Sequence, residues 1–338
     1  MGHQTALEMF SRSLDLNRLC STYLLAGPPG IGKRVAARAC AQLILCHQRS
    51  GIKSCGVCSS CSALKKGQHP RFNERDFAAQ KKSSESVVDV VRAFIEEVQR
   101  LGGDGQALIF LIPNIQDYSM QVQNALLKTL EEPPSGVIFL LTADHPQELL
   151  ETITSRSQLI HLSPLSFAEL KTILRHKKGD FEWSDMVLQL SEGRVDLALQ
   201  YSKESYLKLI RWVDQRLLKS DQDFIESSDQ LMALAQELSL PQMEKSDDAE
   251  VGDRAFATAA IAVFERLFMQ KCLSATRQHF VALQIFNTTV EELLEARRSI
   301  ENHGYVALSV EYYMQIALAR LGQILRTVRI PETAVAAE

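Results

Sequence analysis

A glycine-rich loop between an apolar segment and a helical one most limits how this chain can fold. Residues 23–26 are apolar and short, as expected of a buried strand. They lead directly into Gly-Pro-Pro-Gly-Ile-Gly-Lys at 27–33, and an alanine- and leucine-rich helix is expected over 34–46. A strand, a glycine-rich loop and a helix in this order are typical of a phosphate-binding unit in a parallel α/β sheet.

The loop fits the pattern G-x-x-x-x-G-K but not the serine or threonine that should follow. Gly27, Gly30 and Gly32 would let backbone N–H groups wrap a phosphate, and Lys33 would reach its outer oxygens. The hydroxyl that holds magnesium is replaced by Arg34. The context indicates descent from a phosphate loop, with a glycine-rich turn of no function as the alternative. Whether the loop still binds nucleotide stays open.

The second magnesium-supporting element is also missing. A phosphate loop needs a carboxylate at the end of a nearby strand, to orient magnesium and water. The candidate strand, 108–112, ends in Pro113-Asn114, and Asp117 follows too late and is interpreted as a helix-start residue. Because both elements are absent together, we expect ATP and Mg²⁺ not to be bound productively.

The apolar pattern divides the chain into an α/β part and a helical part. A helix is expected over 5–19, and strands over 106–112, 137–141 and 159–162 alternate with helices over 84–99 and 120–131. This alternation predicts a parallel, doubly wound sheet. After residue 166 only helices are expected, over 167–177, 183–191, 195–219, 222–238, 254–273, 277–302 and 306–327.

Four of the seven cysteines lie close together, as Cys46, Cys55, Cys58 and Cys61. The two C-x2-C steps place thiolates around one metal, and Cys46 completes a tetrahedron from the end of the preceding helix. With all four positions filled, we predict a structural Zn²⁺ site. An iron–sulfur cluster is the alternative, although no cysteine-proline follows at the ferredoxin spacing. The scattered thiols are interpreted as ordinary buried cysteines: Cys20, Cys40 and Cys272.

Composition and charge limit the possible partners. Hydrophobic residues make up 46% and charged residues 23% of the 338 residues, as in globular proteins without a membrane span. The net charge is −4, and no long basic run is present, so we expect any contact with DNA to be made within an assembly. The first residues lack the pattern of a secretory signal, which favours a cytoplasmic location.

One arginine stands at a place where two interpretations compete. Arg156 lies in Thr-Ser-Arg-Ser-Gln at 154–158, between an apolar helix and the strand expected at 159–162. A lone arginine of this kind is usually only solvated. Arginine is also the residue that stabilises the charge on a transferred phosphoryl group when a neighbouring subunit supplies it. The residues alone favour the solvated interpretation.

Several segments together resemble the bacterial clamp-loader ATPase family. They are the phosphate loop, the inserted four-cysteine module, His69-Pro70, Ala-Leu-Leu-Lys-Thr-Leu-Glu-Glu-Pro-Pro at 125–134 and Ser-Arg-Ser at 155–157. The block at 125–134 is highly specific, and it aligns the family's acidic pair with Pro113 and Asn114. The resemblance is strong over residues 3–165 and weak over the helical remainder.

The resemblance implies an AAA+ architecture of three parts. Residues 1–165 would form the α/β nucleotide-binding-like domain, with the zinc module at 46–66 inserted in it. Residues 166–220 would form the helical lid, and residues 221–330 an all-α collar for assembly.

The resemblance also implies a role and partners. The chain would join gamma/tau and delta subunits in a hetero-pentameric ring that opens the sliding clamp and loads it on primed DNA for DNA polymerase III. It would not be catalytic alone. Arg156 would be an arginine finger that acts in trans on ATP held by a gamma/tau neighbour.

Three alternatives belong to other classes. A gamma/tau-like ATPase and a stand-alone P-loop NTPase or nucleotide kinase both require a working magnesium site. A free zinc-ribbon nucleic-acid binder would not be expected to carry its module inside an α/β domain, nor to be mildly acidic.

Overall fold

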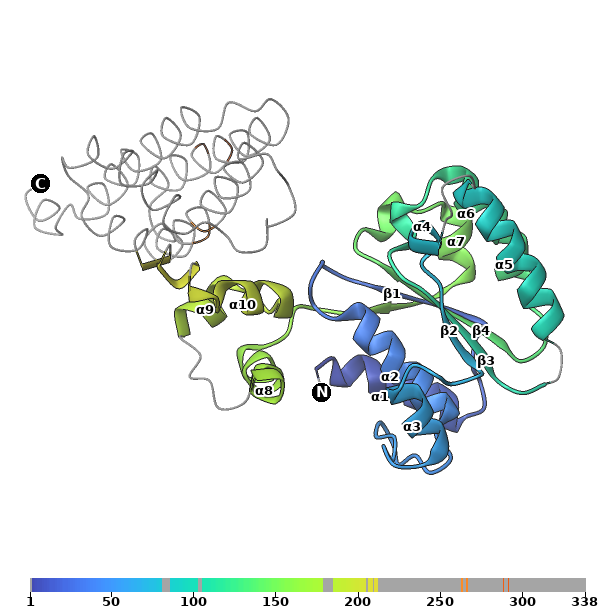
Figure 1. Cartoon of the computed structure of the whole chain (residues 1–338), viewed down its shortest axis with the longest axis horizontal. Coiled ribbons are helices and arrows are strands. Elements are labelled where there is room, and N and C mark those ends of the chain that lie inside the picture. Colours follow the sequence, from blue (N-terminus) through green and yellow to red (C-terminus); the bar gives the residue numbers. More distant parts are fainter. Residues whose placement is uncertain are drawn as a thin grey trace, which may run out of the picture. The chain divides into compact units, whose positions relative to one another are not determined.

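The computed structural model of the protein describes residues 2–80, 86–102, 105–178, 185–204, 206–208, 210–211, 263, 266, 288 and 291. The chain divides into two compact units, residues 1–198 and 199–338. All helices and strands named below begin in the first unit, which Figure 1 shows in blue to yellow-green. No helix among the described residues is both long and apolar enough to cross a lipid bilayer.

A five-stranded parallel sheet forms the centre of the first unit. The strand order is β2-β3-β4-β1-β5, and every neighbouring pair is parallel. The strands span Thr22–Ala26 (β1), Phe72–Glu74 (β2), Leu108–Ile112 (β3), Val137–Ala143 (β4) and Gln158–His161 (β5). Crossover connections by helices are what parallel pairing requires, so the alternation of strands and helices is confirmed.

The helices of the first unit alternate with these strands. Those before β3 are α1 (Gln4–Asp15), α2 (Lys33–Leu45), α3 (Ser59–Lys65), α4 (Phe77–Gln80) and α5 (Val87–Leu101). Later ones are the 3-10 helix η1 (Ile115–Asp117), α6 (Met120–Glu131), the 3-10 helix η2 (Pro146–Glu148), α7 (Glu151–Arg156), α8 (Phe167–Lys178), α9 (Asp185–Leu190) and α10 (Val195–Tyr201).

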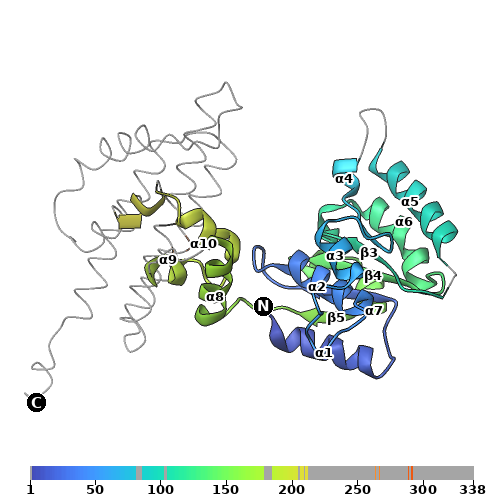
Figure 2. The ribbon, with the colours of Figure 1, turned by 60° about the horizontal axis from the view of Figure 1, so that its bottom comes forward.

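The sheet is covered on both faces, as Figures 1 and 2 show with α2 and α5 on opposite sides. Alternate residues of a strand point to opposite faces. Ile109 and Leu111 accordingly join the cluster under α1 and α2, whereas Phe110 and Ile112 join the cluster under α5, α6 and α7. The central strands are buried along their whole length, which explains their continuous apolar runs.

The structure differs from the sequence expectation at several element ends. Helix α1 stops at Asp15, not at 19, because Asn17 adopts a left-handed backbone conformation with φ of 53°. Helix α5 begins at Val87, after Ser86, whose side chain accepts a hydrogen bond from the N–H of Asp89 at 3.2 Å. Strand β2 was not predicted, because its three residues are only partly buried.

The helical part agrees with expectation for α8, α9 and the start of α10. Helices α8 and α9 fall within or close to the predicted ranges 167–177 and 183–191, and α10 begins at the predicted residue 195. Helix α10 ends at Tyr201 and a turn follows, so the single helix predicted over 195–219 was wrong at that point. Residues 212–219, and almost all of the helices predicted over 222–238, 254–273, 277–302 and 306–327, lie outside the described residues. The domain boundaries at 165 and 220 therefore stay predictions.

Candidate functional site

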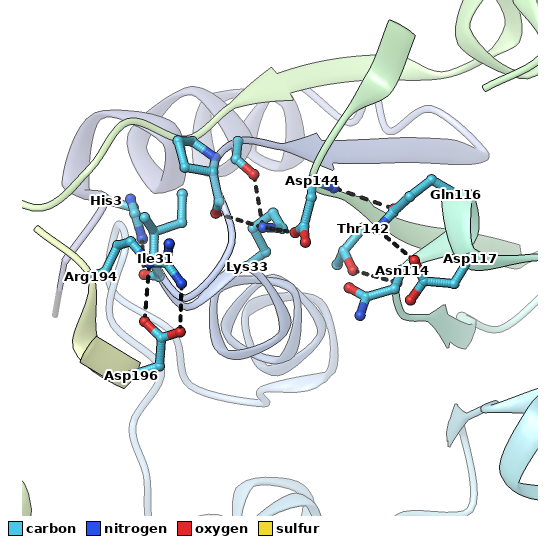
Figure 3. A network of polar contacts seen from close by, with 12 residues as sticks. His3, Ile31, Lys33, Asn114, Gln116, Asp117, Thr142, Asp144, Arg194 and Asp196 are labelled. Carbon is cyan, nitrogen blue, oxygen red and sulfur yellow. Dashed lines mark hydrogen bonds and ion pairs between the residues drawn. The ribbon is translucent and has the colours of Figure 1, made fainter. Parts of the chain in front are cut away.

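The glycine-rich loop joins β1 to α2 at the carboxyl edge of the sheet (Figure 3). Gly30 and Gly32 have φ of 75° and 99°, a left-handed conformation that favours glycine. Gly32 stands directly before the first turn of α2. The loop therefore has the backbone form that the sequence predicted, at the edge where parallel sheets bind their ligands.

Lys33 is buried, with 5% of its surface exposed, and its ammonium group contacts two backbone carbonyls and one carboxylate of the same chain. Its Nζ donates to the carbonyl oxygens of Gly27 at 2.8 Å and Pro28 at 2.7 Å. It also forms an ion pair with the carboxylate of Asp144. An ammonium has three N–H donors, and these three acceptors match them.

Asp144 is a site residue that the sequence analysis missed. It directly follows β4, which pairs with β1 in the sheet, so it stands next to the loop that β1 carries. Its backbone N–H donates to Oε1 of Gln116 at 3.3 Å, which links it to the turn after β3 (Figure 3).

Arg34, which replaces the expected serine or threonine, is paired with a carboxylate from another element. It forms an ion pair with Glu74, the last residue of β2. Arg38, one turn further along α2, donates to the same carboxylate from Nε at 2.9 Å. Glu74 is thus a carboxylate at a strand end, but it is paired with two guanidinium groups.

The end of β3 carries no carboxylate, as the sequence predicted. Asn114 has a left-handed backbone with φ of 48°, and its N–H donates to Oγ1 of Thr142 at 2.9 Å. Asp117 closes the short 3-10 helix η1, and its carboxylate accepts from Nε2 of Gln116 at 3.1 Å. Asp117 therefore stands before α6 and not at its first residue.

The four cysteines predicted to hold a metal are brought together. The sulfur atoms of Cys46, Cys55, Cys58 and Cys61 all lie within 4.8 Å of one another. Tetrahedral zinc with Zn–S bonds of about 2.3 Å separates its sulfur ligands by about 3.8 Å. Cys55 and Cys61 have their Sγ atoms 3.9 Å apart, which suits that geometry and is far from the S–S distance of a disulfide.

Backbone N–H groups point at the sulfur atoms of this cluster. The N–H of Cys55 donates to Cys46 Sγ at 3.3 Å, that of Cys58 to Cys55 Sγ at 3.3 Å, and that of Cys61 to Cys58 Sγ at 3.4 Å. The backbone N–H groups of Cys61 and then His47 lower the pKa of the Cys58 thiol to about 6, whereas burial raises the pKa of the Cys61 thiol to about 11. Thiolates are the form that binds metal, so this arrangement fits zinc.

The other two described cysteines differ from each other. Cys40 is buried within α2, as predicted, whereas Cys20 is exposed in the turn before β1, so the prediction of a buried thiol was wrong there. That turn lies at the surface, and the backbone N–H of Cys20 donates to the hydroxyl of Tyr23 at 2.9 Å. Cys272 lies outside the described residues.

His69 connects the cysteine module to the sheet. Its Nδ1 accepts from the N–H of Arg71 at 3.1 Å, so its Nε2 carries the proton and donates to Ser60 Oγ at 3.0 Å. Burial, and then the neighbouring charges of His47 and Arg71, lower the pKa of His69. The ring therefore stays neutral near pH 7 and works as a fixed hydrogen-bonding link.

Arg156 lies away from the loop and the cysteines, as the last residue of α7. Its Nε is 2.7 Å from Oε1 of Glu131, the last residue of α6. Its Nη1 donates to the carbonyl oxygen of Thr152 at 3.1 Å. The two partners hold a side chain that is still 40% exposed.

The fold and the loop define a class, an α/β module of the P-loop type that resembles an AAA+ domain. A family model described as "DNA polymerase III, delta subunit" matches residues 2–166. The delta' subunit of DNA polymerase III from Yersinia pestis is 32% identical over 234 residues, which cover 67% of this chain and 65% of that protein.

Two further relatives come from Escherichia coli K12. Its delta' subunit is 35% identical over 159 residues, 44% of this chain and 47% of that protein. Its tau subunit is 34% identical over 176 residues, 52% of this chain and 27% of that protein. The chain thus spans about a quarter of the tau protein and between half and two thirds of the delta' proteins.

The chain belongs to the family of DNA polymerase III clamp-loader subunits and is of the delta' type. The tau match is partial and covers only 27% of that protein, so it does not favour a tau-like protein over a delta'-like one.

Proposed function

We propose that this chain helps to load a sliding clamp on primed DNA, without hydrolysing ATP itself. The observation that carries the second half of this proposal is the state of the loop. Lys33 is paired with Asp144, Arg34 is paired with Glu74, and the end of β3 offers Asn114 where a carboxylate is needed. Magnesium has neither of its usual supports here.

The partners follow from the relatives. Proteins named delta', tau and gamma of DNA polymerase III are similar to this chain, so the proposed assembly is a ring with gamma/tau and delta subunits. The collar predicted over 221–330 would hold the ring together. DNA and the clamp would be contacted within that ring, in keeping with a chain whose own net charge is −4.

Zinc is the proposed metal of the four cysteines. Four sulfur ligands leave no open position for a substrate, so the metal would be structural. The cysteine module is tied to α1 by Ser11, whose Oγ donates to the carbonyl oxygen of Gly51 at 3.0 Å, and by the ion pair of Arg49 with Asp15 at 2.6 Å. The metal would fix a module whose elements are otherwise short.

Arg156 is the proposed arginine finger. A guanidinium delivered to a neighbour's nucleotide offsets the charge that develops on the transferred phosphoryl group. The described geometry supports this role, because the side chain is exposed and yet held by Glu131 and Thr152.

The test is ATP turnover by the purified chain, alone and with a gamma/tau partner. We expect no meaningful turnover by the chain alone, and stimulated turnover only when the partner is present. Lys33→Ala is the control, because a working phosphate loop loses turnover with its lysine. Steady hydrolysis by the chain alone that Lys33→Ala abolishes would contradict the proposal and favour a stand-alone ATPase.

A further inference from the structure

The carbonyl oxygens of the glycine-rich loop are bound by the chain itself. Gly27 and Pro28 accept from Lys33, as described above. The carbonyl of Gly30 accepts from the N–H of Val195 at 3.0 Å, and the carbonyl of Ile31 lies 2.9 Å from Nε2 of His3. The loop is therefore held in its curved form by protein contacts from three separate segments.

A carboxylate lies directly against the glycine-rich loop. A methyl group added at Gly30 would overlap the carboxylate of Asp196, which lies in the first turn of α10. The same carboxylate binds Arg194, with Nη2 to Oδ2 at 2.9 Å and Nε to Oδ1 at 3.3 Å (Figure 3).

Asp196 carries its charge at neutral pH. Burial alone would raise its pKa, but the hydrogen bonds from Arg194 and from the backbone N–H of Leu197 outweigh burial, and the pKa lies below its usual value. An anion that approached Gly30 would meet this negative charge at close range.

Two positive charges next to the loop, besides Arg34, are thereby paired with carboxylates. Lys33 is paired with Asp144 and Arg194 with Asp196, so the four charges cancel. A phosphate would have to displace Asp144 from Lys33 and to approach Asp196. In a phosphate loop the lysine and the backbone N–H groups bind the anion, whereas here the lysine is paired with Asp144 and the carboxylate of Asp196 lies against Gly30.

We propose that Asp144 and Asp196 close the loop to phosphate, and that the loop binds the start of helix α10 in place of a nucleotide. The proposal deepens the proposed function, since it rests on a loop that has lost its nucleotide chemistry and explains what the loop now does. The lid helix would keep its position on the loop in every stage of an ATP cycle run by other subunits.

The test measures binding of ATP and of inorganic pyrophosphate to the full-length, zinc-loaded chain by titration calorimetry. Asp144→Asn keeps the shape of the side chain and removes the charge that holds Lys33. Asp196→Asn removes the charge at Gly30 and releases Arg194. Because a carboxylate close to an anion opposes its binding strongly, we expect each change to tighten binding by about tenfold and the double variant to bind most tightly.

Two further variants make the result specific. Adding Lys33→Ala to Asp144→Asn should abolish the gain. Asp15→Asn is the matched control, because it breaks the ion pair with Arg49, away from the loop, and should leave binding unchanged. Circular dichroism and zinc content show whether each variant is folded. If Asp144→Asn fails to fold, Asp196→Asn still tests the proposal. The side chain of Asp196 is half exposed, so its replacement should leave the fold intact.

The proposal is overturned if the parent chain binds ATP as tightly as the double variant, or if the gain survives Lys33→Ala. ATP turnover measured on the same samples separates this result from the proposed function. If the double variant binds ATP without turning it over, the result supports both the closure of the loop and the proposed function. Turnover by the parent chain would instead contradict the proposed function.

Discussion

Arg156 and Glu131 form an ion pair between the last residue of α7 and the last residue of α6, with Nε and Oε1 2.7 Å apart. Each side chain is about two-fifths exposed, and an exposed pair of this kind contributes about 0–1 kcal/mol to stability. Its consequence is therefore geometric. The carboxylate fixes one edge of the guanidinium plane, and the outer edge stays directed away from α6.

The first prediction concerns Arg156 itself. We expect Arg156→Ala to leave folding, zinc content and assembly unchanged and to lower the DNA- and clamp-stimulated ATPase of the reconstituted complex. Loss of an arginine finger costs roughly 10³–10⁵ in rate at the site it serves. Because only one of several sites would depend on Arg156, the total rate should fall by that site's share.

Arg156→Lys should not restore the rate fully, because an ammonium lacks the planar fork of a guanidinium. The measurement is ATP turnover and clamp loading at matched assembly. A complex with Arg156→Ala that turns over ATP and loads clamps like the parent would show that Arg156 is only a surface residue.

The second prediction concerns Glu131 as the residue that positions Arg156. We expect Glu131→Ala to lower stimulated turnover by less than Arg156→Ala, and Glu131→Gln to lie nearer the parent, since its amide oxygen can take the same place beside Nε. The thermal unfolding temperature should change little, because an exposed ion pair contributes little to stability.

Glu132→Ala is the matched control, one residue further and also exposed. Glu131→Ala should have no effect in the Arg156→Ala background, which a double-mutant cycle measures. Equal losses in both backgrounds would mean that Glu131 acts independently of Arg156.

Parts of the site that depend on neighbouring residues could be predicted from the sequence. The loop at 27–33 and the cysteines from 46 to 61 carry their chemistry in short spacings, and the structure brings both sets together. The absence of a carboxylate after β3 also followed from the order of residues. These features need only local backbone geometry.

The charge partners could not be predicted in the same way. Asp144, Glu74 and Asp196 reach the loop because of strand order and helix docking, which the sequence does not state. A signal for Asp144 was present, since it directly follows a fully buried strand and the carboxyl ends of parallel strands share one edge.

The third prediction concerns the metal. We expect about one zinc per chain, because the cluster offers four ligands for one ion. Cys58→Ser should lose the metal and lower the unfolding temperature, because metal binding stabilises the folded module. Zinc content by atomic emission and melting by circular dichroism measure both effects.

Cys20→Ser is the control, because Cys20 is exposed and outside the cluster. It should retain zinc and melt like the parent. An iron-containing, coloured protein would favour an iron–sulfur cluster, and carefully purified material without metal would contradict the zinc site.

The last prediction concerns alkaline pH and the buried thiol of α2. Burial raises the pKa of Cys40 from 9.0 to about 12. The folded chain keeps this proton where the unfolded chain releases it, so the contribution to stability is complete below pH 9 and is lost as pH rises toward 12. The loss from this one group should be about 1.4 kcal/mol by pH 10.

Cys40→Ala removes that group while leaving a small apolar side chain among its neighbours. We therefore expect the parent to lose about 1.4 kcal/mol more unfolding free energy than Cys40→Ala between pH 8 and pH 10, measured by urea denaturation at both values. Tyr23, whose pKa burial raises to about 12, is present in both chains, and Cys40 is only the smallest of the causes that shift its pKa. Cys20→Ala, which removes an exposed thiol, should follow the parent. Equal losses in the parent and in Cys40→Ala would show that the Cys40 thiol ionises alike in the folded and unfolded chains.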